Sequence, residues 1–305
     1  MSKNFALRGL VAATFTPMHA DGRLNLALAK PMIERLLAGK VSAAFACGTT
    51  GECASLTSEE RRQTLCAFID AAAGRMPVIA HVGHSALADS CELAAHAQAV
   101  GAAAVATTPP YYFRPDSVDA LVECMAQIAA AAPELPFYYY HIPHLTGVGL
   151  SMEAFLRQAA GRIPNLVGIK YTAPTVYEYH ACAAYDNGRY DLLFGCDEML
   201  LSGIATGAQG AVGSTYNLAP RLYHRIRECF EAGQIEEARR LQLLSVRMVD
   251  IAKAFRPLPA LKAMLGFAGC DFGPTRMPLV AMRADEIETL RRQLDEIGFL
   301  EWMTV

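Results

Sequence analysis

The sequence predicts a (β/α)8 barrel followed by additional helices. Short runs rich in β-branched residues or alanine alternate with longer amphipathic stretches, and this order does not reverse before about residue 218. Such alternation is typical of βα units arranged around a parallel sheet. Eight strand candidates favour a closed barrel over a doubly wound open sheet, which is the less probable arrangement of the same units.

The strand candidates are recognised by apolar runs that stop at a polar or small residue. They end near Thr14, Cys47, Val82, Thr107, Tyr140, Lys170, Phe194 and Gly213. The clearest helix start is Thr57, because Thr57 can cap the helix and Glu60 can close a capping box. Other helix candidates cover about 25–38, 86–99, 116–131, 151–160, 176–185 and 198–206.

After residue 218 the strand signals stop and helical periodicity takes over. The helical patterns cover roughly 219–232, 235–255, 258–268 and 284–297. We therefore expect the barrel over residues 1–218, with the last barrel helix and a C-terminal helical extension packed on the barrel over 219–305. No Pro/Ser-rich linker separates the two parts, so we expect no flexible boundary.

Composition excludes several classes of partner. The net charge is −3 and the 27 basic residues form no run or stripe, which argues against nucleic acid and against an anionic membrane. Apolar stretches break well before the roughly 18 to 20 residues of a membrane span, and residues 1–10 lack a signal-peptide pattern. We expect a cytoplasmic protein.

Cysteine and histidine spacing gives no sign of a metal centre. Nine cysteines are scattered from Cys47 to Cys270 without a C-x-x-C pair, which favours reduced, buried thiols over a disulfide or zinc framework. His81 and His84 lie three residues apart without a nearby carboxylate, and a structural role suits them better than metal binding. We expect no metal.

Polar and aromatic residues follow six of the strand candidates. In a (β/α)8 barrel the carboxyl ends of the strands converge on one face, and catalytic residues lie there. These residues are therefore expected to share one pocket. They occupy 48–52, 111–112, 140–141, 170–172, 197–198 and 214–217.

Lys170 is the one lysine of six that closes an apolar strand. Its ammonium would enter an apolar environment, where desolvation lowers the pKa of an amine. A neutral amine attacks ketones, so a desolvated lysine suits Schiff-base chemistry. A lysine that ends a strand and extends to solvent is equally compatible with the spacing.

Three further groups have both a functional and a structural interpretation. Thr49 and Thr50 lie between glycines, where hydroxyl and backbone N–H donors could hold a carboxylate, but a plain βα turn fits slightly better. Tyr140 could move protons at the barrel mouth, or simply pack. Asp197 and Glu198 begin a helix, where carboxylates favour the helix dipole whatever their function.

Taken together, six motifs in this order resemble the pyruvate-dependent aldolase family that includes dihydrodipicolinate synthase and N-acetylneuraminate lyase. The motifs are GTTGE (48–52), PPYY (109–112), YYYHIP (138–143), GIKYT (168–172), GCDE (195–198) and GSTYN (213–217). The resemblance covers residues 9 to about 300, and the set is highly specific. It implies the barrel and catalysis without a metal or organic cofactor.

The resemblance also implies roles. Lys170 matches the Schiff-base lysine, and Tyr140 matches the tyrosine that passes protons to and from the substrate. Thr49 and Thr50 match residues that hold the pyruvate carboxylate, with Thr50 also in a hydroxyl relay toward Tyr140. Tyr112 matches an aromatic residue that reaches in from a neighbouring subunit, which implies a homotetramer built as a dimer of dimers.

The implied substrate depends on differences within the family. Leu145 stands where dihydrodipicolinate synthases carry an arginine for the carboxylate of their aldehyde, and leucine cannot make that bidentate contact. The matches to sugar-binding positions of the sialic acid lyase branch are Thr172, Gly195, Asp197, Glu198 and Ser214. The resemblance thus implies reversible cleavage of N-acetylneuraminate to N-acetylmannosamine and pyruvate. Two alternatives are an aldolase or dehydratase of another 2-keto-3-deoxy sugar acid, and a non-catalytic ligand-sensing barrel.

Overall fold

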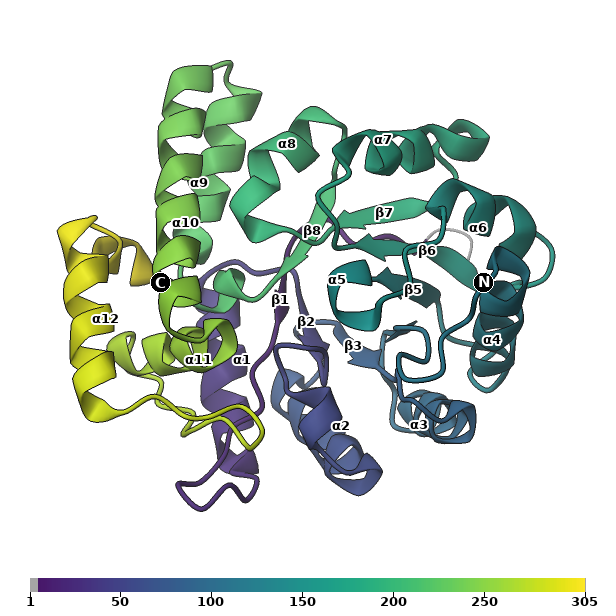
Figure 1. Ribbon diagram of the computed structural model, residues 1–305, viewed down its shortest axis with the longest axis horizontal. Coiled ribbons are helices and arrows are strands. Elements are labelled where there is room, and N and C mark those ends of the chain that lie inside the picture. The colour runs from purple at the N-terminus through teal and green to yellow at the C-terminus, as the bar shows by residue number, and fades with distance from the viewer. Residues whose placement is uncertain (1–4, 305) are drawn as a thin grey trace.

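Eight parallel strands close into a barrel in the computed structural model, which describes residues 5–304 (Figure 1). The strands follow one another around the barrel in chain order, and β8 pairs with β1. The predicted barrel is therefore confirmed, and each strand lies where its apolar run predicted. The strands are β1 Gly9–Ala13, β2 Ala43–Ala46, β3 Val78–His81, β4 Ala104–Thr107, β5 Phe137–His141, β6 Leu166–Tyr171, β7 Asp191–Phe194 and β8 Gly210–Gly213.

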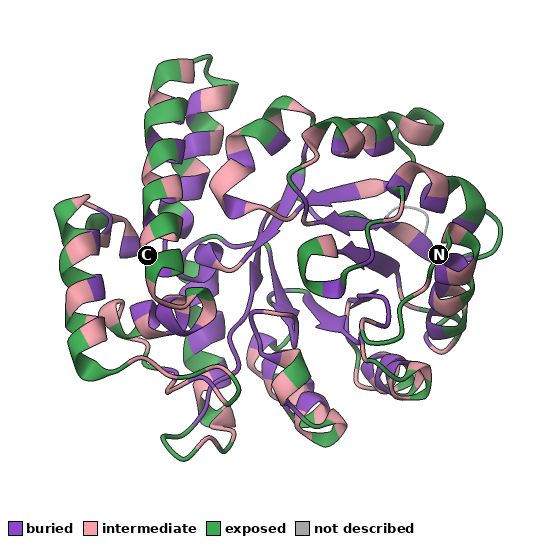
Figure 2. Ribbon diagram, viewed as in Figure 1, coloured by how far each residue is buried: buried purple, intermediate pink, exposed green. Residues whose placement is uncertain are grey.

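Side chains alternate between the barrel interior and the surrounding helices, because successive residues of a strand point to opposite faces. On β5, Tyr138 and Tyr140 join the cluster inside the barrel, whereas Tyr139 packs outward against Phe155, with ring centroids 4.8 Å apart. Tyr138 and Tyr140 therefore share one direction, toward the interior. The strands are buried on both faces, as Figure 2 shows.

Helices surround the barrel and expose their outer faces (Figures 1 and 2). The predicted start at Thr57 is confirmed, since Thr57 and Glu60 form a capping box. The one-turn helix α5, Pro143–Thr146, was not predicted; it starts with proline and spans only four residues, too few for a periodic pattern. The others are α1 Ala29–Ala38, α2 Ser58–Ala72, α3 Leu87–Ala99, α4 Val118–Ala130, α6 Met152–Ala159, α7 Val176–Ala184 and α8 Leu200–Ala205.

Four helices follow β8 and form the C-terminal tail, shown from green to yellow in Figure 1. They are α9 Pro220–Glu231, α10 Ile235–Phe255, α11 Pro257–Phe267 and α12 Ala284–Glu296. Gln242 of α10 ties the tail to the barrel, because its side chain accepts from Leu201 N at 2.8 Å and donates to Asp197 O at 3.3 Å. The tail therefore reaches the mouth of the barrel.

A buried arginine on α1, Arg35, bonds to two segments that lie much later in the sequence. Arg35 donates to the carbonyl oxygens of Asn217 at 3.0 Å and Leu218 at 2.8 Å, beyond β8. It also donates to the Met303 carbonyl oxygen at 2.6 Å. These bonds hold the first barrel helix, the last β-to-α connection and the end of the tail together.

The amino-terminal end of the barrel is closed by a fully bonded carboxylate. Asp191 accepts hydrogen bonds from Tyr138 Oη at 2.6 Å and Leu7 N at 2.9 Å, and pairs with Arg8 at 2.9 Å. Within residues 5–304, no helix combines the length and the apolar character needed to cross a membrane.

Candidate active site

A cavity of about 260 Å³ opens at the carboxyl ends of the strands and contains Lys170 in its wall. Nine of the ten site residues predicted from the sequence line it: Thr49, Thr50, Tyr140, Lys170, Thr172, Gly195, Asp197, Glu198 and Ser214. The barrel brings them together because every strand delivers its last residues to this face. Larger cavities, of about 530, 550 and 530 Å³, lie at the amino-terminal end, beside α7 and beside α11, and none of these three includes the lysine.

Lys170 is 3% exposed, and its amine lies over two aromatic rings. Nζ is 3.9 Å from the ring centroid of Tyr140, its neighbour across β5 and β6, and 4.2 Å from that of Phe45. No hydrogen bond or ion pair joins Nζ to another residue in the range 5–304. Burial lowers the pKa of Lys170 to about 7, an effect that the carboxylate of Asp197 only partly opposes. A substantial fraction of the amine is therefore neutral near pH 7.

Tyr140 presents its hydroxyl to the same cavity. Thr49 Oγ1 lies 3.5 Å from Tyr140 Oη, and the Tyr140 ring packs edge-on against Phe45, with centroids 5.9 Å apart. Burial raises the pKa of Tyr140, and the Thr49 hydroxyl opposes this in part. Tyr140 is thus a neutral phenol that can pass a proton only by exchanging one with a neighbouring hydroxyl.

The two threonines of the loop after β2 take different partners. Thr50 Oγ1 forms a 2.6 Å hydrogen bond with Ser214 Oγ, whereas Thr49 Oγ1 contacts Tyr140 Oη at 3.5 Å. The sequence placed Thr50 in a relay toward Tyr140, whereas here Thr49 is the threonine that approaches Tyr140. A relay through Thr50 stays a prediction.

Asp197 is fixed to the cavity wall, whereas Glu198 keeps more freedom. Asp197 accepts from Thr215 N at 2.8 Å and Thr215 Oγ1 at 2.6 Å, and burial raises its pKa to about 6. A Cβ at Gly213 would overlap the Asp197 carboxylate, so this close approach requires glycine. Glu198 is partly exposed and pairs loosely with Lys253 at 3.4 Å.

Thr172 and Gly195 shape the wall between Lys170 and Asp197. Thr172 Oγ1 is buried and has no hydrogen-bond partner within residues 5–304. A Cβ at Gly195 would overlap this hydroxyl, so glycine leaves it room. An unpartnered buried hydroxyl at a cavity wall is well suited to a ligand that offers hydrogen-bond partners.

Tyr112 does not line the cavity. It is 77% exposed and lies next to Phe113, which is 86% exposed, with ring centroids 5.0 Å apart. A catalytic part for Tyr112 therefore requires a second subunit, as the family resemblance implied, and stays a prediction.

Sequence reasoning missed the contribution of the tail to the cavity. Val249 of α10 and Pro257, Leu258 and Leu261 of α11 line it. Their apolar pattern is that of any packed helix, so the sequence contains no signal that separates these residues from the core.

The histidines near β3 have structural partners. His81 is buried, with Nδ1 2.9 Å from the Cys47 carbonyl oxygen, and Arg61 donates to the His81 carbonyl oxygen at 2.7 Å. Burial lowers the pKa of His81, and the positive charge of Arg61 adds to this effect. In the range 5–304, no three His, Cys, Asp or Glu side chains are grouped so that they could hold a metal ion.

A (β/α)8 barrel with a desolvated, unpaired lysine at its mouth is suited to imine chemistry on a carbonyl compound. The chain belongs to the dihydrodipicolinate synthetase family, which it matches over residues 6–297. It is 39% identical over 299 residues to the N-acetylneuraminate lyase of Xenopus tropicalis, covering 96% of this chain and 98% of that protein.

Two solved structures are also similar to this chain over nearly its full length. The N-acetylneuraminate lyase of Proteus mirabilis superposes with a TM-score of 0.94 at 35% identity, covering 97% of this chain and 100% of that one. The sialic acid aldolase of Aliivibrio salmonicida also superposes with a TM-score of 0.94, at 34% identity and with 97% and 98% of the two chains covered.

Proposed function

We propose that this protein is a class I aldolase that cleaves N-acetylneuraminate reversibly to N-acetylmannosamine and pyruvate. The observation that carries the proposal is the buried, unpaired Lys170 at the cavity wall, in a chain whose full-length relatives are N-acetylneuraminate lyases. The lysine supplies the chemistry, and the relatives point to the sugar. No metal or organic cofactor is required, because an iminium on the lysine is itself the electron sink.

The reaction begins with the neutral amine of Lys170. It attacks the C2 ketone of the open-chain sugar acid, and water leaves to give an iminium. The electrons of the C3–C4 bond then flow into the iminium as the C4 hydroxyl loses its proton, which releases the aldehyde N-acetylmannosamine and leaves an enamine. Protonation at C3 and hydrolysis free pyruvate and restore the amine.

Tyr140 handles the proton of the C4 hydroxyl. As a buried neutral phenol, it accepts this proton while it gives its own to an adjacent hydroxyl, and Thr49 is within 3.5 Å. Thr50 and Ser214 form the next hydroxyl pair along the wall. In this proposal, the same group returns a proton to the enamine.

The other residues that line the cavity form two regions, which bind different parts of the substrate. Thr49 and Thr50 hold the carboxylate next to the ketone, on the loop that follows β2. Thr172, Gly195, Asp197, Glu198 and Ser214 face the hydroxyl-rich chain of the sugar. Hydroxyl and carboxylate groups can exchange hydrogen bonds with such a neutral chain.

Leu145 argues against an aldehyde that carries its own carboxylate. It lines the cavity and is 56% exposed, and no guanidinium belongs to the lining. A carboxylated aldehyde such as aspartate semialdehyde would lose the bidentate partner that an arginine provides.

Assembly and location follow the same reasoning. The exposed pair Tyr112 and Phe113 fits a subunit interface at which Tyr112 enters the neighbouring cavity, in a homotetramer. The 27 basic residues form no run or stripe, which argues against nucleic acid. The proposed partners are small molecules, and the proposed location is the cytoplasm.

The test compares substrates on the purified protein. Pyruvate release is measured from N-acetylneuraminate and from 2-keto-3-deoxygluconate at equal concentrations. We expect a clear preference for N-acetylneuraminate. Faster release from 2-keto-3-deoxygluconate would move the assignment to another sugar acid, and release from neither substrate would favour a ligand-sensing barrel.

A further inference from the structure

The loop after β2, residues 48–52, carries Thr49 and Thr50 and ends in a buried carboxylate. The Glu52 side chain is fully buried, and its backbone adopts a left-handed conformation with φ 58°. Glu52 does not line the cavity. A buried carboxylate this close to the substrate-binding threonines is costly unless it is fully partnered.

Both oxygens of Glu52 are bonded by the C-terminal tail. Lys262 of α11 donates to Oε1 at 2.7 Å, and its side chain is 1% exposed. The backbone N–H of Arg276 donates to Oε2 at 2.8 Å. Lys262 also donates to the Pro274 carbonyl oxygen at 2.8 Å, which holds the segment before Arg276 in place.

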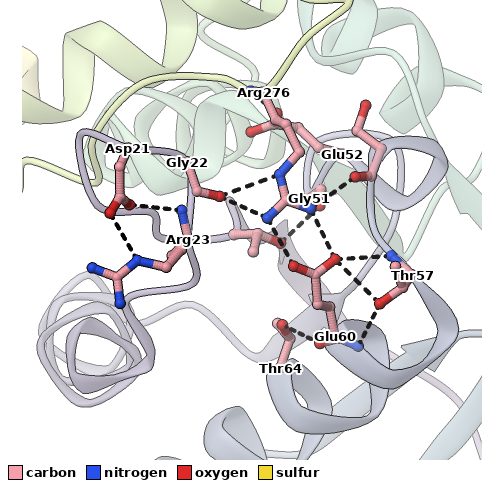
Figure 3. A network of polar contacts seen from close by, with 11 residues as sticks. Asp21, Gly22, Arg23, Gly51, Glu52, Thr57, Glu60, Thr64 and Arg276 are labelled. Atoms are coloured by element: carbon pink, nitrogen blue, oxygen red, sulfur yellow. Dashed lines mark hydrogen bonds and ion pairs between the residues drawn. The ribbon is translucent and has the colours of Figure 1, made fainter.

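Arg276 extends the attachment to the start of α2, as Figure 3 shows. Its guanidinium binds both oxygens of Glu60, each at 2.8 Å, and donates to the Ser55 carbonyl oxygen at 3.0 Å and the Gly22 carbonyl oxygen at 2.6 Å. This pairing lowers the pKa of Glu60 to about 2. We call Glu52, Glu60, Lys262 and Arg276 the clamp.

The clamp adds an attachment to the C-terminal tail that the other contacts of the loop do not provide. Within the loop, Glu52 N donates to the Thr49 carbonyl oxygen at 3.0 Å, and Thr16 Oγ1, from the segment after β1, donates to the Gly51 carbonyl oxygen at 2.7 Å. These bonds fix the turn itself. Among residues 5–304, the Lys262–Glu52 contact is the one hydrogen bond or ion pair between this loop and α11, whose Leu258 and Leu261 also line the cavity.

We propose that Glu52 and Lys262 are positioning residues that set the loop of Thr49 and Thr50 at the correct distance for the pyruvate carboxylate. Breaking the pair moves the carboxylate-binding hydroxyls and leaves the sugar-binding residues that follow β6 and β7, Thr172, Gly195, Asp197 and Glu198, in place. This inference rests on the proposed function, because it assigns pyruvate to that loop.

The test measures the binding of pyruvate and of N-acetylmannosamine separately, in the condensation of the two compounds. Half-saturation for pyruvate is measured by borohydride trapping of the imine and by steady-state condensation, and KM for N-acetylmannosamine is measured at saturating pyruvate. For Glu52→Gln and Lys262→Met we expect pyruvate half-saturation to rise about 10- to 100-fold, the range for one lost hydrogen bond to a charged group. We expect KM for N-acetylmannosamine to change less than about twofold.

Two further variants separate positioning from stability. The double variant Glu52→Gln with Lys262→Met removes both charges, so it regains thermal stability while the loop stays unattached and pyruvate half-saturation stays raised. Asp191→Asn is the matched control, because Asp191 is also a buried, multiply bonded carboxylate but lies at the opposite end of the barrel. It is expected to lower the melting temperature without changing pyruvate half-saturation.

Two outcomes count against the clamp. Unchanged pyruvate half-saturation in the folded variants would overturn it, and so would an equal rise in the constants for both substrates. Either result would leave the proposed function intact, provided that the wild-type protein traps pyruvate. Absence of an imine in the wild-type protein would instead remove the proposed function, and the clamp with it.

Discussion

Lys170 and Lys262 are buried to nearly the same extent, 3% and 2% exposed, in very different surroundings. Lys262 is 2.7 Å from the carboxylate of Glu52 and 2.8 Å from a carbonyl oxygen, so its charge is matched. Lys170 has aromatic rings at 3.9 and 4.2 Å and no direct anionic partner among residues 5–304. Burial lowers the pKa of both lysines, but only Lys262 has a bonded carboxylate that opposes the shift.

The comparison shows that the partner, and not the depth of burial, decides what a lysine can do. A paired ammonium is a structural group, because its lone pair is occupied by a proton that the carboxylate stabilises. An unpaired amine in the same degree of burial readily gives up that proton and becomes a nucleophile. The following variants break or sharpen this contrast.

Removing the nucleophile gives the largest effect. Lys170→Ala is expected to abolish both turnover and borohydride trapping of pyruvate, because no other lysine among residues 5–304 lines the cavity. The measurement is intact-protein mass after reduction with borohydride. Lys30→Ala, at an exposed position on α1, is the control and should trap pyruvate as the wild type does. Full trapping in the Lys170 variant would show that another amine forms the imine.

Removing the hydroxyl of Tyr140 is expected to give the second-largest effect. Tyr140→Phe is expected to lower kcat by about 10²- to 10⁴-fold while trapping of pyruvate persists, because proton transfer is lost and the amine remains. The control is Tyr139→Phe on the same strand, where the buried hydroxyl has no hydrogen-bond partner within residues 5–304. It should keep its rate. An undiminished kcat for Tyr140→Phe would exclude the proton-transfer role.

Replacing Lys170 or Lys262 by methionine tests the difference between the two lysines by its effect on the free energy of unfolding. Lys262→Met leaves a buried carboxylate unpaired and is expected to cost about 3–5 kcal/mol of the free energy of unfolding. Lys170→Met removes a buried ammonium without a direct partner, so at pH 6 it should be as stable as the wild type or more stable. Urea unfolding followed by circular dichroism measures both. Equal losses of unfolding free energy in Lys170→Met and Lys262→Met would contradict the difference between the two lysines.

The pH dependence gives the smallest effect. The pKa of Lys170 is about 7, so the rate of imine formation should rise about tenfold per unit below pH 7 and level off above it. The unfolded lysine titrates near 10.5, so the unfolded chain binds more protons between pH 7 and 10.5, and stability rises with pH in that window. Lys170→Met should lack this rise. Single-turnover trapping rates and urea midpoints from pH 5.5 to 9 provide the test.

Sequence reasoning located the barrel strands and the cavity residues because both depend on local patterns. An apolar run that ends in Lys170 is visible in the chain, and the barrel carries that strand end to the mouth. The clamp was not found, since Glu52 and Lys262 are 210 residues apart and each alone resembles an ordinary surface charge. The pairing of Thr50 with Ser214 was missed for the same reason.

The bonds from Arg35 to Leu218 and Met303 have a consequence for the order in which the protein is made. A ribosome releases α1 long before Leu218 and Met303, so the last of these guanidinium contacts forms only after Met303, 268 positions further along, has been made. Until then the guanidinium of Arg35 lacks its Met303 partner. A chain that stops before Met303 would lose one of the three carbonyl partners of this buried guanidinium, and cellular quality control would meet a barrel whose C-terminal tail is less firmly attached.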